Sequence, residues 1–159
     1  CIRDRCRWIA YGDSVVFHYN RHTELLEHSF TRLADFSNPP RLVSCKDPLE
    51  EEGCCSGVFH IDDASIVFAA SDALSHYVLM MYELSKSAEF ESELMELRMK
   101  RTSNSQLLQM AEKEVFKFYD DVLSPLLRSV DSEADFKELM ESLYVKKLID
   151  IDDYTLAIL

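Results

Sequence analysis

The chain has 159 residues, of which 47% are hydrophobic and 29% are charged, enough for one domain with a proper core. It carries 29 Asp and Glu against 17 Lys and Arg, and this net charge of −12 argues against non-specific nucleic-acid binding, which needs a basic face. No apolar run approaches the ~20 residues of a membrane span, so we expect a cytoplasmic protein that binds neither nucleic acid nor membranes.

The first five residues, Cys-Ile-Arg-Asp-Arg, spell the translated tail of a common transposase sequencing adapter. We therefore leave residues 1–5 out of the fold prediction, because such a segment does not belong to the natural protein. We expect residues 6–159 to be natural protein whose N-terminal part is missing.

The N-terminal third of the remaining chain predicts β-strands. Residues 8–11 and 14–19 are rich in aromatic and β-branched side chains, and Gly12-Asp13 separates them. Residues 23–30 can pair back as a hairpin arm.

Two segments that interrupt regular secondary structure follow before the next predicted strand. Pro39-Pro40 resists both helix and central strand, and residues 47–57 predict a loop because of their proline, glycines and glutamate run. After a turn at Asp62-Asp63 we expect a buried strand over residues 65–70.

From residue 73 the apolar residues recur at helical spacing. The polar run 102–105 offers an N-cap, Pro125 bends or ends a helix, and Asp131 or Ser132 caps the last one. The predicted segments are helices over residues 73–84, 90–97, 107–122 and 133–143, and a final strand over residues 154–159. This order of strands, helices and one last strand is typical of an α+β domain.

Acidic residues stand beside apolar strands at three distant places. The motifs are Gly12-Asp13-Ser14, Ser71-Asp72-Ala73 and Asp152-Asp153-Tyr154. A buried carboxylate without a partner is costly, so such acids lie where a strand leaves its sheet. If these strands are neighbours, the acids meet, and a cation must then offset their repulsion. Hard oxygen ligands select Mg²⁺, Mn²⁺ or Ca²⁺.

Each acid also has an ordinary explanation in isolation. Asp13 fits a turn after a glycine. Asp72 fits the N-cap of the helix that begins at Ala73, where the helix dipole favours a negative charge. Asp152 and Asp153 fit a solvated entry to the last strand.

Together the motifs resemble the C-terminal part of protein phosphatase 2C-type Ser/Thr phosphatases, most closely the bacterial stand-alone members. The likeness covers Trp8 to Leu159, although residues 86–128 match only as helix. The segments that carry it are Trp8–Ser14, Phe36–Ser44, the Asp62-Asp63 turn, Ala70–Leu74 and Leu148–Leu156.

The resemblance implies a partial α-β-β-α sandwich of antiparallel sheets, with two Mn²⁺ or Mg²⁺ ions at one end of the sheets. It implies that Asp72 and Asp152 are metal ligands and that Asp13 helps hold a third, weaker ion. The residues that would stand beside these ligands without binding metal are Ser14, Ser71 and Asp153. The implied activity is hydrolysis of phosphoserine and phosphothreonine in a phosphoprotein substrate, by a protein that is a monomer when intact.

The chain departs from the family pattern in two ways. His76 stands where many members carry a further aspartate, which weakens the third metal position; it could face the same cleft or lie on the helix surface or in the core. The family's Asp-Gly-x-Gly strand and first Glu-Asp pair would precede this chain. Two or three carboxylates cannot fill two octahedral shells, so we expect this chain alone to bind metal weakly and to be inactive. The alternatives are a non-catalytic relative and an acidic helical module that binds a partner.

Overall fold

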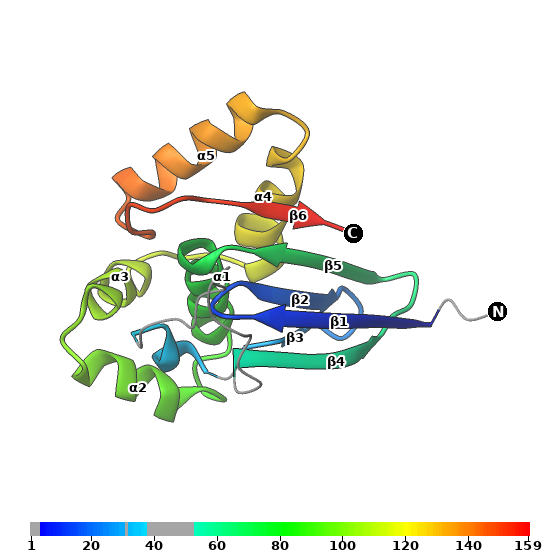
Figure 1. Ribbon diagram of the computed structural model, residues 1–159. Coiled ribbons are helices and arrows are strands. Elements are labelled where there is room, and N and C mark those ends of the chain that lie inside the picture. Colours follow the sequence, from blue (N-terminus) through cyan, green and yellow to red (C-terminus); the bar gives the residue numbers. More distant parts are fainter. Residues whose placement is uncertain (1–3, 31, 38–52) are drawn as a thin grey trace, which may run out of the picture.

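The computed structural model describes residues 4–30, 32–37 and 53–159 (Figure 1). The strands are β1 (Arg5–Tyr11), β2 (Val15–Asn20), β3 (Leu25–His28), β4 (Cys54–His60), β5 (Ser65–Ala70) and β6 (Leu156–Ile158). The helical elements are η1 (Leu33–Ser37), α1 (Asp72–Ser85), α2 (Glu91–Met99), α3 (Ser103–Ala111), η3 (Phe118–Leu123), α4 (Ser124–Ser129) and α5 (Glu133–Val145). The α+β class is confirmed, as is the helical segment before the last strand.

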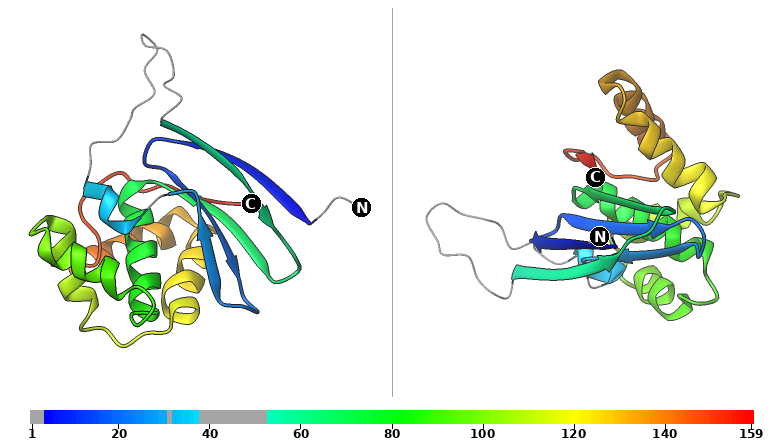
Figure 2. Two further views of the ribbon diagram at one scale, coloured as in Figure 1. Left: turned by 90° about the horizontal axis from the view of Figure 1, so that it is seen from below. Right: turned by 90° about the vertical axis from the view of Figure 1, so that its right-hand side faces the viewer.

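The strands form two antiparallel sheets, one of β1 and β4 and one in the order β3-β2-β5-β6. Figure 2 shows the two sheets as adjacent layers, with the helices against the side of the larger sheet that faces away from β1 and β4. Trp8 and His18 both contact the ring of Phe59, at centroid distances of 5.5 and 5.4 Å, which joins the two sheets. On the outer face of the smaller sheet Ile9 is 76% exposed, so the described residues form two sheets and one helical layer.

The core lies between the larger sheet and α1. Alternate residues of β2 point into it, and Phe17 stacks on Phe68 of β5 with ring centroids 4.8 Å apart. Every residue of α1 from Leu74 to Glu83 is buried, because the sheet covers one side of this helix and the later helices cover the other. The described helices include none that is long and apolar enough to cross a membrane.

The predicted loop over residues 47–57 is wrong at its C-terminal end, where Cys54 begins β4; residues 47–52 lie outside the described part of the chain, as do Pro39-Pro40 and most of Phe36–Ser44. Gly57 suggested a loop, but it is paired with Trp8 in the sheet. A Cβ atom at Gly57 would lie 2.5 Å from the Trp8 ring, so the glycine gives room to the indole rather than marking a turn.

The predicted helix over residues 107–122 is wrong as a single element. It ends at Ala111 and a new helical segment begins at Phe118, while Val115 between them is fully exposed. Lys117 donates its backbone N–H to Asp121 Oδ2 at 2.7 Å and so starts the second segment locally. Pro125 lies in the first turn of α4, directly after η3 ends at Leu123.

Phe68→Ala should lower the free energy of unfolding by about 3–5 kcal/mol, because it removes a fully buried ring and leaves a cavity beside Phe17. Urea unfolding followed by circular dichroism measures the change. Val115→Ala, at a fully exposed position, is the control and should change the stability little. A loss at Phe68 no larger than that of the control would contradict the described core.

Candidate functional site

The register of the larger sheet brings the three acid-bearing motifs to the same end. Val15 of β2 pairs with Ala70 of β5, and Ala70 pairs on its other side with Leu156 of β6. Asp13 lies just before β2, Asp72 just after β5 and Asp152 shortly before β6. Because the strands are antiparallel neighbours, these three positions share one edge of the sheet.

Ser71 fixes the segment that carries Asp152 against the start of α1. Its backbone N–H donates to Thr155 O at 3.1 Å, and its hydroxyl donates to Asp153 O at 3.0 Å. The N–H of Thr155 in turn donates to Ser71 Oγ at 3.0 Å. Ser71 rather than Asp72 is the N-cap residue of α1, so the predicted N-cap role of Asp72 is wrong by one residue. Asp72 is the first helical residue, where the helix dipole still favours its charge.

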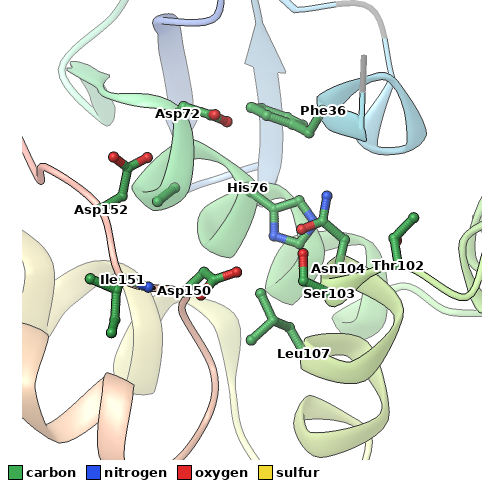
Figure 3. A pocket seen from close by; sticks show the side chains of 11 residues that line it. Phe36, Asp72, His76, Thr102, Ser103, Asn104, Leu107, Asp150, Ile151 and Asp152 are labelled. Atoms are coloured by element: carbon green, nitrogen blue, oxygen red, sulfur yellow. Dashed lines mark hydrogen bonds between the residues drawn. The ribbon is translucent and has the colours of Figure 1, made fainter. Parts of the chain in front are cut away.

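A pocket of about 360 Å³ lies where these segments meet. Figure 3 shows side chains from four parts of the chain around it, with the ring of His76 pointing into the pocket. The lining residues are Phe36 of η1, Asp72, Ala73 and His76 of α1, Thr102, Ser103, Asn104 and Leu107 at the start of α3, and Asp150, Ile151 and Asp152 before β6. Asp72 and Asp152 therefore line one pocket.

The neighbouring carboxylates act on Asp72. Burial, together with the nearby charges of Asp13 and Asp152, raises the pKa of Asp72 to about 6. Asp13 is thus close enough to act on Asp72, although it does not line the pocket. This repulsion is what a bound cation would relieve.

The start of α3 forms the other side of the pocket. Leu108 is fully buried and anchors this helix in the core, and Lys100 donates to Ala34 O at 3.0 Å, which holds the preceding turn against η1. Thr102 is the N-cap residue, as the polar run predicts, but its side chain makes no capping hydrogen bond. Its Oγ1 is buried and has no hydrogen-bond partner among the described residues.

His76 is the buried histidine of this pocket. It is 3% exposed, and its ring meets Phe36 edge-on at a centroid distance of 5.5 Å. Burial lowers the pKa of His76 to about 4, although the charge of Asp150 opposes this shift, so the imidazole is neutral at pH 7. No described residue makes a hydrogen bond to its Nε2.

The remaining predicted site residues, Ser14 and Asp153, do not line the pocket. Ser14 is exposed at the turn before β2. Asp153 is exposed and donates its backbone N–H to Asp152 Oδ1 at 2.8 Å, which orients that carboxylate. The sequence prediction missed Asp150 and Thr102 as lining residues; the acidic run from Asp150 to Asp153 was the available signal for the first.

A different acidic group lies at the opposite end of the sheet. His22, Asp62 and Asp63 are exposed, and theirs is the one described set of three whose ligand atoms all lie within 4.8 Å of one another. Asp62 already accepts from Asn20 at 2.9 Å and from Ser65 Oγ at 3.0 Å, which lowers its pKa. These contacts explain Asp62 as a turn residue.

The ligand atoms of Asp13, Asp72 and Asp152 do not all lie within 4.8 Å of one another, so these acids are more widely spaced than the His22 group. Carboxylates without a counter-ion repel one another, which favours the wider spacing. Mg²⁺ and Mn²⁺ commonly keep several waters and contact a site through few carboxylates, so the donor set fits such an ion without a tight cage.

In the absence of metal, Asp72→Asn should stabilise the protein at pH 7 by about 1 kcal/mol, allowing for the solvent screening of a half-buried group. The pKa of Asp72 in the folded state, about 6, lies above the ordinary 3.8, so the folded state binds the extra proton and stability falls as pH rises between these values. Urea unfolding across this pH range should show a flatter profile for the variant. Asp131→Asn, an exposed control, should leave the profile unchanged, and an Asp72→Asn protein less stable than wild type at pH 7 would contradict the repulsion.

Comparisons with protein-family models, with curated proteins and with solved structures each found no match to this chain.

Proposed function

We propose that this pocket is the metal site of a protein phosphatase 2C-type enzyme that hydrolyses phosphoserine and phosphothreonine in proteins. Asp72 and Asp152 would bind Mn²⁺ or Mg²⁺ directly, and Asp13 would contribute to a further, weaker ion. The observation that carries the proposal is that three acids, from motifs 59 or more residues apart in the chain, lie at one end of one sheet, where Asp13 and Asp152 raise the pKa of Asp72.

The chemistry of the pocket supports a hard divalent cation. Its ligands are carboxylate oxygens, and the described residues place no cysteine there. A bound ion of this kind activates water and offsets charge on phosphoryl oxygens. The contribution of the chain is to hold Asp152, through the Asp153 N–H and the Ser71 contacts, in a fixed position opposite Asp72.

The number of ligands limits the activity that we expect. Three carboxylates fill only part of two octahedral shells. We therefore propose hydrolysis for a protein in which further acids complete the site, and expect this chain alone to bind the ion weakly. A non-catalytic relative would share the metal site and differ in lacking hydrolysis, so the two activities must be measured separately.

The first measurement is the titration of the chain with Mn²⁺ by electron paramagnetic resonance, in which the signal of the free ion falls as the ion binds. Asp72→Asn and Asp152→Asn should each weaken binding by about tenfold or more, since even hydrogen-bond partners of metal ligands change affinity by that factor. Asparagine at residue 152 keeps an oxygen that can accept from the Asp153 N–H, so the local fold should persist.

Asp131→Asn is the matched control, because it removes the same charge from an exposed site outside the pocket. Unchanged Mn²⁺ binding in both pocket variants would reject the metal site. Loss of binding in Asp62→Asn instead would move the ion to the His22 group. Release of phosphate from a phosphoserine peptide, measured with the longest version of the protein that its gene encodes, then separates the enzyme from a relative that only binds.

A further inference from the structure

The N-terminus of α3 presents unused hydrogen-bond donors to the pocket. The first turn of this nine-residue helix contains no acidic residue, and the amides of Ser103 and Asn104 have no acceptor among the described residues. The Thr102 hydroxyl, which would ordinarily accept from one of these amides, is buried without a partner. The positive end of the helix dipole therefore faces the pocket without a balancing group.

His76 adds a second and independent feature on this side. The side chain is almost completely buried, lines the same pocket and leaves Nε2 without a partner among the described residues. A buried polar atom without a partner costs about 1–3 kcal/mol. The residues that carry these two atoms, His76 of α1 and Thr102 at the start of α3, line one pocket, and a ligand there would satisfy both atoms once the side chains turn toward it.

The two sides of the pocket carry opposite electrostatic character. Asp72, Asp150 and Asp152 favour a cation, whereas the start of α3, with Thr102 and His76, favours an anion that accepts hydrogen bonds. The volume of 360 Å³ is many times the about 30 Å³ that one water occupies in the liquid, so it can hold both.

We propose that the N-terminus of α3, together with Thr102 and His76, binds the phosphoryl group of the substrate beside the metal ion. The amides of Ser103 and Asn104, the Thr102 hydroxyl and a ring N–H of His76 donate to its oxygens. This inference rests on the proposed function, because a chain of net charge −12 with acids in the pocket repels phosphate until a cation neutralises them.

A role for His76 as a metal ligand is less well supported. Mg²⁺ and Mn²⁺ prefer oxygen ligands such as carboxylates, whereas imidazole nitrogen suits zinc, copper, iron and nickel. A neutral imidazole can still donate a hydrogen bond to phosphate. Phosphate binding also gives Thr102 and the α3 amides a function, which metal binding does not.

The test is a titration of inorganic phosphate into the chain at saturating Mg²⁺, followed by amide chemical shifts in two-dimensional NMR. The amides of Ser103 and Asn104 should shift, and Asn104→Asp should weaken phosphate about tenfold or more, because it adds a negative charge beside the anion. Asp is favourable near a helix N-terminus, so this variant should fold. Thr102→Val should weaken phosphate less, since it removes one donor.

Gln109→Glu is the matched control: it adds the same charge to an exposed position of α3 outside the pocket and should leave phosphate affinity unchanged. Equal affinity in wild type, Asn104→Asp and Thr102→Val would overturn the inference, as would no phosphate binding to the Mg²⁺-loaded chain. The Mg²⁺ titration alone reports on the proposed function. If Mg²⁺ shifts the amides around Asp72 and Asp152 but phosphate leaves those of α3 unmoved, the metal site stands and the phosphate site falls.

Discussion

The pairing of β5 with a strand on each side is the constraint on which the candidate site depends. Because β5 lies between β2 and β6, the segments that carry Asp13 and Asp152 must both lie beside the start of α1. Strand β6 is short, and three hydrogen bonds between Ser71 and residues 153–155 extend its attachment beyond the ladder. These hydrogen bonds hold the residues just before β6, and with them Asp152, against the start of α1.

Some of the turns between strands could be predicted from the sequence because they depend on local signals. Gly12 has a φ of 78°, which a glycine adopts without strain, and it marked the turn before Asp13 correctly. The order β3-β2-β5-β6 could not be predicted, since pairing between distant strands depends on the whole core. Gly57 shows the limit of local signals: the contact that requires a glycine comes from Trp8, which is distant in sequence and adjacent in the sheet.

The two sides of the pocket differ in how far the sequence revealed them. His76 is four residues after Asp72 on one helix, so helical spacing allowed a shared face, which was one of the positions that the sequence left open. The start of α3 was predicted as an N-cap at residues 102–105, but its place opposite the acids depends on how α2 and α3 fold back onto α1. Arg98 and Glu112, whose side chains approach to 2.6 Å, hold those two helices together, and the sequence pattern did not indicate that contact.

The pocket combines two arrangements that each cost stability. The acids that raise the pKa of Asp72 destabilise the folded chain, and so do the buried atoms Nε2 of His76 and Oγ1 of Thr102, which lack partners among the described residues. Apolar side chains would fill the same space without either cost, as they do at Leu107 on the same helix. A cation and a phosphate bound together would offset both costs, since each neutralises the other and each completes one side, and ligands that bind only the folded state stabilise it. One wall of the pocket favours a cation and the facing wall favours an anion, which a ligand with two charges explains better than packing does. A metal ion with its phosphate is the ligand that we propose.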